Sequence, residues 1–133
     1  MDWERQAAWM RDADRVEVVS PIREGVGTTV AVVTRVLNVP LFTERLEVIV
    51  WEPPRRLVMA HRSWIGGTGT WRLAPAGSGC RFRWSEDLTL PPPVLGELAL
   101  RVYAPFMGRL MQSAMWALHG SIERASGPHG TLA

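Results

Sequence analysis

Apolar and polar residues alternate along most of the chain between residues 15 and 90. This period of two is typical of half-buried β-strands, and short segments rich in glycine or proline separate the alternating stretches. Strands joined by such short connections pair with their sequence neighbours, so the pattern predicts an antiparallel meander. Six strands are predicted, at residues 15–20, 28–37, 40–51, 56–63, 70–75 and 80–90.

Helical periodicity is found at both ends of this strand region. Trp3, Ala7 and Met10 fall on one helical face, which predicts a short N-terminal helix. After the prolines at 91–93 the period changes again, and a helix is predicted over residues 94–125. A helix of that length would extend roughly 45–50 Å.

The long predicted helix is amphipathic and contains Pro105. Proline removes a backbone hydrogen bond, so a bend near residues 101–105 is expected. The apolar side must pack on the sheet, and a bent helix on a curved sheet leaves a gap suited to a ligand. The polar side carries Arg101, Arg109, Gln112, His119 and Glu123, and the apolar side carries Ala99, Tyr103, Phe106, Met107, Leu110, Met111, Ala114 and Leu118.

Composition narrows the class of protein. The 133 residues suit one domain, expected at 1–125, with a flexible tail at 126–133. All 15 basic residues are arginines, they are scattered, and the net charge is only +2, so nucleic-acid binding is not expected. The single Cys80 excludes an internal disulfide and is predicted to be a buried small residue; no metal site and no cofactor are indicated. With no apolar run of about 18 residues, the chain is expected to be cytoplasmic, without stable membrane insertion.

The segment WEPPRRL at 51–57 allows two interpretations. Two consecutive prolines between apolar segments are typical of a turn that ends one strand before the next begins. The alternative is an anion contact at Arg55 and Arg56, because paired arginines can bind carboxylate or phosphate. The turn is favoured.

Several segments, in their order, resemble the START-like (SRPBCC) superfamily and, within it, the polyketide cyclase/dehydratase group. They are GVGTTV, LEVIVWEPPRRLVM, TGTWRLAPAGSGCRFRW and MWALHGSIERA, and the resemblance covers about residues 2–125. It implies an α+β helix-grip fold, in which a curved antiparallel sheet wraps around a long C-terminal helix and encloses an apolar cavity.

The chain departs from this family at its N-terminus. Members usually have an edge strand and a fuller first helix before the Asp2-Trp3 pair. Either the start lies too far downstream or this strand is absent, and its absence would expose the neighbouring strand and favour a homodimer.

Three polar residues are candidates for catalysis. His61 shares strand parity with Leu57 and Met59, so its imidazole could exchange protons inside the cavity, although a satisfied half-buried histidine is favoured. Glu86 could be a buried carboxylate with a raised pKa or a solvated strand end. Tyr103 could donate its hydroxyl to a ligand carbonyl or be a core residue. A buried ion pair between Arg35 and Glu44 is also considered.

Seven tryptophans and six methionines favour an apolar pocket. The first hypothesis is binding of a hydrophobic or aromatic small molecule, such as a lipid, quinone or polyketide-like compound, between sheet and helix. The alternatives are a cyclase/dehydratase-like enzyme and a ligand-free interaction or stress-response module. The predicted ligand-binding residues are Trp9, Met59, His61, Trp71, Phe82, Trp84, Tyr103, Met107, Leu110 and Met111.

Overall fold

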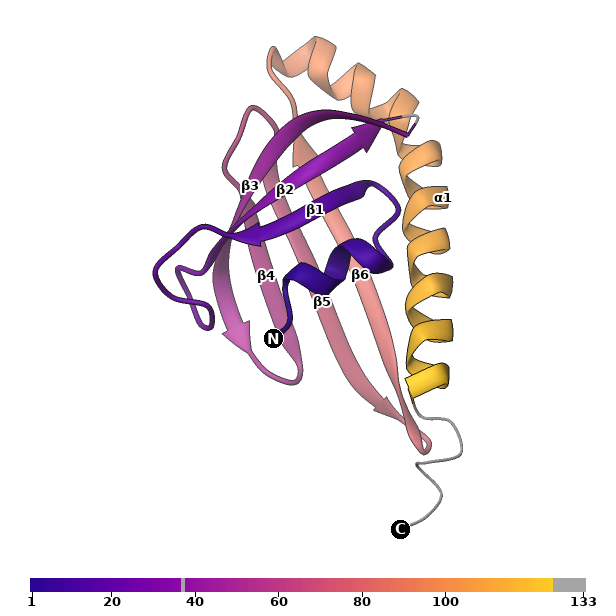
Figure 1. Cartoon of the computed structure of the whole chain (residues 1–133). Helices are drawn as coiled ribbons and strands as arrows, with labels where there is room; N and C mark the ends of the chain where they lie inside the picture. The colour runs from indigo at the N-terminus through magenta and orange to yellow at the C-terminus, as the bar shows by residue number, and fades with distance from the viewer. Residues whose placement is uncertain (37, 126–133) are drawn as a thin grey trace.

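The computed structural model describes residues 1–36 and 38–125, and it confirms the predicted α+β architecture (Figure 1). A short 3₁₀ helix, η1 (Glu4–Ala8), precedes six strands, and one long helix, α1 (Pro93–Ala125), follows them. Each strand pairs antiparallel with its sequence neighbours, so the sheet order is the chain order. The strands are β1 (Ala13–Val18), β2 (Thr29–Val36), β3 (Val39–Glu52), β4 (Arg56–His61), β5 (Gly66–Ala76) and β6 (Gly79–Thr89).

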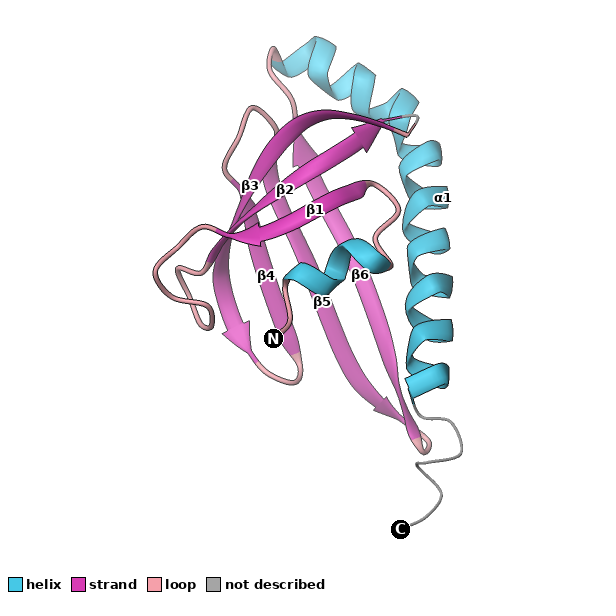
Figure 2. Ribbon diagram, viewed as in Figure 1, coloured by secondary structure: helices cyan, strands magenta, loops and turns pink. Residues whose placement is uncertain are grey.

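The sheet is strongly curved. Register shifts interrupt the ladders between Ala13 and Arg15, between Thr34 and Arg35, and between Val48 and Val50. An extra residue in one strand of a pair bends that strand and increases its twist. Figure 2 shows the result, in which β1, β2 and the far part of β3 fold over the concave face formed by β4, β5 and β6.

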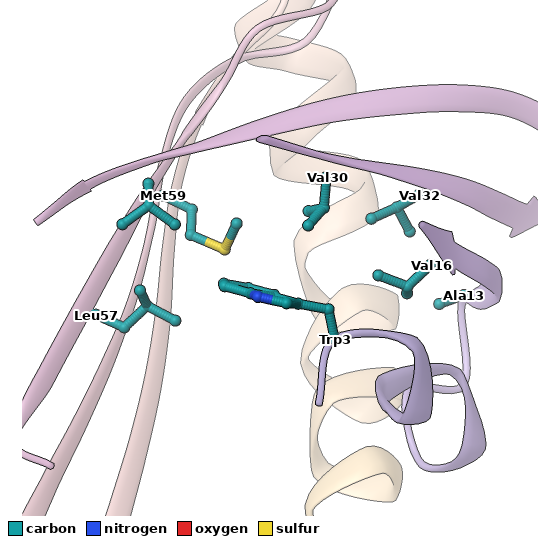
Figure 3. Packing of buried hydrophobic residues seen from close by; sticks show 8 residues of the cluster. Trp3, Ala13, Val16, Val30, Val32, Leu57 and Met59 are labelled. Carbon is teal, nitrogen blue, oxygen red and sulfur yellow. The ribbon is translucent and has the colours of Figure 1, made fainter. Parts of the chain in front are cut away.

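The core lies beneath η1, inside this curve. Trp3 is fully buried, and its indole Nε1 donates a hydrogen bond to the Arg23 carbonyl at 2.8 Å. Figure 3 shows its ring between Leu57 and Met59 on one side and valines from β1 and β2 on the other. Ala7 and Met10 pack against the same cluster, which confirms the predicted apolar face of the first helix.

The segment at 51–57 is a turn, as predicted. Strand β3 ends at Glu52 and β4 begins at Arg56, while the Arg55 amide donates to the Glu52 carbonyl at 2.8 Å. The Arg56 guanidinium is already engaged, because its Nε lies 3.0 Å from the Glu52 carboxylate. Arg56 thus already has a carboxylate partner, and an anion contact at the two arginines stays a prediction.

Two predictions that concern β5 and β6 are wrong. The glycine-rich segment between the predicted strands 56–63 and 70–75 was expected to be a turn, but from Gly66 onward it belongs to β5. Its glycines permit close strand contact: Gly67 has φ of 109°, and a Cβ there would collide with the Asp87 backbone of β6. Cys80 is exposed rather than buried, because β5 and β6 extend past the core at that end of the sheet.

Helix α1 stands beside β6, at the open side of the sheet, and Figure 1 shows its change of direction. Pro105 lies inside the helix, as expected for the bend. The predicted polar side is exposed, but Ala99 and Phe106 of the predicted apolar side are exposed as well. No helix in the described ranges combines the length and apolar character needed to cross a membrane.

Strand β6 is an edge strand. Within the described residues it pairs only with β5, over eleven positions. An unpaired edge of this length can accept a strand from another chain, so the homodimer remains a prediction.

Candidate functional site

A cleft of about 760 Å³ lies between the concave face of the sheet and the first half of α1. That volume is in the range of small-molecule sites. Apolar side chains form most of its walls, with Leu46 and Trp84 from the sheet and Leu98, Val102 and Phe106 from the helix. The helix side chains remain well exposed: Leu98 at 60% and Val102 at 74%. The predicted gap between helix and sheet is therefore present as an open cleft.

The sheet side of the cleft carries a hydrogen-bonded group that we call the polar cluster: Glu44, His61 and Glu86. Nδ1 of His61 lies 3.2 Å from Glu44 Oε1, and Nε2 lies 3.1 Å from Glu86 Oε2. The Trp84 indole donates to Glu86 Oε1 at 2.6 Å, and the Thr34 hydroxyl donates to Glu44 Oε2 at 3.3 Å. A single imidazole thus bridges two carboxylates from opposite sides.

This arrangement determines the charge on His61. The side chains of the polar cluster are only 10–17% exposed, so solvent screens them weakly. Burial by itself lowers the pKa of the imidazole, but hydrogen bonds and charge attraction from Glu44 and Glu86 outweigh it and raise the pKa of His61 to about 9. At neutral pH both ring nitrogens therefore carry protons and donate to the two carboxylates.

Gly69 explains how His61 and Glu86 meet across the strand that lies between them. His61 lies on β4 and Glu86 on β6, with β5 between them. Gly69 of β5 pairs with Glu86, and a Cβ at that position would lie only 2.7 Å from Glu86 Oε1. Because glycine has no side chain, the carboxylate can cross over β5 and reach the imidazole.

Two further polar side chains face the cleft. Asp12 precedes β1, and its carboxylate makes no ion pair within the part of the chain that the structure describes. Burial, followed by the charges of Glu44 and Glu86, raises the pKa of Asp12. Burial and the nearby carboxylates also raise the pKa of the half-buried Tyr103. The site thus contains the carboxyl group of Asp12 and the phenol of Tyr103. Burial favours the protonated form of both groups.

The structure brings the three predicted catalytic candidates to the same cleft, because His61, Glu86 and Tyr103 all line it. The Arg35–Glu44 pair that was considered does not form: Arg35 pairs with Asp14, and Glu44 turns inward to His61. Sequence reasoning also missed Asp12, which lies outside any strand. In the sequence, only the position of Glu44 along its strand could indicate that its side chain points inward. The register shift between Thr34 and Arg35 obscures which side of the sheet that position faces.

The predicted ligand-binding residues are distributed over several places. Four of them line the cleft: His61, Trp84, Tyr103 and Met107. Met59 and Trp71 line a smaller chamber beside it, and Met111 lines a third hollow between β6 and α1. Trp9 and Phe82 pack against Trp71, with ring centroids 5.7 and 5.6 Å away, and Leu110 lines none of the described cavities. Their role in binding stays a prediction.

A curved antiparallel sheet, a long C-terminal helix and an apolar cleft between them define the helix-grip class. The sequence profile of one such family, described as polyketide cyclase / dehydrase and lipid transport, matches residues 1–123. The chain belongs to this family. Among curated protein sequences none matches it.

Proposed function

We propose that the protein binds an apolar small molecule that carries a polar group. The observation behind this proposal is a cleft with mostly apolar walls and a polar cluster on its sheet side. The apolar body would contact Leu98, Val102 and Phe106, and the polar group would lie near Asp12 and Tyr103. A lipid, a quinone and a polyketide-like compound all have this combination of parts.

The open cleft favours a binding protein over a ligand-free module. A ligand-free domain would fill such a space with its own side chains, since protein interiors are close-packed. Here several large apolar side chains of α1 are left facing the cleft, with Val102 at 74% exposure. A bound apolar molecule would remove that surface from water, at about 25 cal/mol per Å².

The test is native mass spectrometry of freshly purified protein, followed by titration with the neutral fluorescent probe N-phenyl-1-naphthylamine. Phe106→Asp places a carboxylate on the cleft wall and is expected to weaken probe binding by ~10-fold or more. Ile122→Asp is the matched control, because Ile122 is on the same helix, is 55% exposed and lines none of the described cavities. Equal affinity in the two variants, or no uptake by the unsubstituted protein, would contradict the proposal.

A second candidate is acid–base catalysis on a ketone, favoured by the convergence of Asp12, the polar cluster and Tyr103 on one cavity. His61 is already protonated and donates to Glu44 and Glu86, so it is poorly suited to act as the base. Asp12 has no ion-pair partner among the described residues, and its raised pKa makes the ionised carboxylate a stronger base, which could accept a proton from the carbon beside a carbonyl. The electrons of that C–H bond would pass into an enolate, whose oxygen could accept a hydrogen bond from the Tyr103 hydroxyl.

Deuterium exchange into the methyl group of acetophenone, followed by NMR in D₂O, tests this chemistry. The protein is expected to accelerate exchange by ~10²-fold or more over buffer, and Asp12→Asn is expected to abolish the acceleration. Asp14→Asn is the matched control, since Asp14 pairs with Arg35 and does not line the cleft. Exchange at the buffer rate, while the probe of the preceding experiment binds, would leave ligand binding as the function.

A further inference from the structure

The ionisable side chains that line the cleft are mostly acidic. Asp12, Glu44 and Glu86 face it, and His61 is the one basic side chain among the described residues that do so. None of the 15 arginines lines the cleft, although all of them lie in the described part of the chain. The protein as a whole has a formal net charge of +2. The acidic lining is therefore a local property of the cleft.

The donors of the polar cluster are already engaged, whereas its acceptors are not exhausted. Both ring nitrogens of His61 donate to Glu44 and Glu86. The Trp84 indole and the Thr34 hydroxyl donate to the same two carboxylates. Each of these carboxylate oxygens thus accepts one hydrogen bond, and a carboxylate oxygen can accept two. Because two carboxylates share one imidazolium, the cluster also keeps an excess of negative charge.

Asp12 adds a third carboxyl group to these surroundings. Burial, followed by the charges of Glu44 and Glu86, raises the pKa of Asp12, so the three carboxyl groups lie close enough to affect one another. Burial and the charges of Asp12 and Glu44 raise the pKa of Tyr103 in the same way. A ligand head group that enters this part of the cleft therefore meets one phenol and three carboxyl groups.

We propose, on the basis of the binding function above, that the cleft selects an amphiphile with an ammonium head group over the matching carboxylate. An ammonium has three donors and no acceptor, so it complements the free lone pairs of Asp12, Glu44 and Glu86. A carboxylate would lose its hydration and meet like charge, which disfavours binding. Phe42 and Trp64 also line the cleft, with ring centroids 5.2 Å apart, and aromatic faces attract a cation.

Displacement of N-phenyl-1-naphthylamine by dodecylamine and by dodecanoic acid tests this selectivity. The two competitors share an alkyl chain and carry opposite charges at pH 7. Each is used below its micelle-forming concentration, in the range where the circular dichroism spectrum of the protein is unchanged. Dodecylamine is expected to displace the neutral probe at a concentration lower by ~10-fold or more. Nonspecific attraction to a chain of net charge +2 would favour dodecanoate instead.

Glu44→Gln tests whether the polar cluster is the source of the selectivity. This substitution nearly keeps the shape of the side chain and removes one carboxylate from the cleft. It is expected to reduce the ratio of the two displacing concentrations by ~3-fold or more. Glu47→Gln is the matched control, because Glu47 is on the same strand, pairs with Arg62 and does not line the cleft. Its ratio is expected to equal that of the unsubstituted protein.

The unsubstituted protein separates the outcomes without any variant. Uptake of the probe with preferred displacement by dodecylamine supports the selectivity. Uptake with equal displacement, or with preference for dodecanoate, overturns the selectivity and leaves the proposed binding function standing. Absence of probe uptake overturns both. Equal ratios in Glu44→Gln and Glu47→Gln would also overturn the role of the polar cluster.

Discussion

Protonation of His61 is predicted to make the stability of the fold depend on pH above neutrality. The folded-state pKa is raised from 6.5 to about 9 because Glu44 and Glu86 hold the imidazolium between them. The folded protein therefore keeps a proton that the unfolded chain releases. This stabilisation is fully present below pH 6.5 and is lost as pH rises through about 9. At ~1.36 kcal/mol for each pKa unit, it amounts to about 3 kcal/mol.

Urea denaturation followed by tryptophan fluorescence at several values between pH 6 and pH 9.5 measures this effect. The free energy of unfolding of the unsubstituted protein is expected to fall by most of that amount across the range. His61→Gln removes the titrating group, so the variant is less stable near pH 6, and its difference from the unsubstituted protein shrinks toward pH 9.5. His119→Gln is the control, since that side chain is 62% exposed and pairs only with Glu123 on its own helix.

The reasoning would be refuted if the unsubstituted protein and His61→Gln lost stability in parallel across this range. Asp12, whose pKa is raised by burial and by the charges of Glu44 and Glu86, is present in both proteins, so the comparison between them reports on His61. An NMR titration of the His61 ring gives a second reading, with the imidazolium signal expected to persist above pH 8. If the two proteins lost stability in parallel and the His61 ring titrated as an ordinary imidazole, Glu44 and Glu86 would not hold the proton.

Three further predictions concern the fold and its edges. Gly69→Ala places a Cβ against Glu86 and is expected to destabilise the protein by about 1–3 kcal/mol and to lower the NMR-measured pKa of His61; wild-type values for both would contradict the strand-crossing role of Gly69. Trp3→Ala, at a fully buried site, is expected to cost about 3–5 kcal/mol in urea denaturation, and a cost below 1 kcal/mol would mean that η1 is not part of the core. Light scattering is expected to give twice the 14.9 kDa chain mass if the free edge of β6 pairs with a second copy, and a monomer at high concentration would argue against that pairing.

Much of the architecture was predictable because it depends on local patterns. Alternation of apolar residues predicted six strands, and the prolines before residue 94 predicted where the long helix begins. Strand parity made His61 and Glu86 candidates for the cavity and the helical face did the same for Tyr103; all three line the cleft. The errors occurred where a residue type has two uses. Gly66 and Gly67 suit a turn, but they equally suit a strand whose neighbour approaches closely, and the local sequence does not distinguish the two.

The sequence by itself determined the order of the elements, the side of β4, β5 and β6 that faces inward and the apolar character of the space between sheet and helix. Only the tertiary structure decided which polar groups meet there. Asp12, Glu44, His61 and Glu86 come from four separate segments, and register shifts together with the missing side chain at Gly69 bring them to the same cleft. The charge of His61 follows from that meeting, because its pKa depends on burial and on carboxylates distant in the chain.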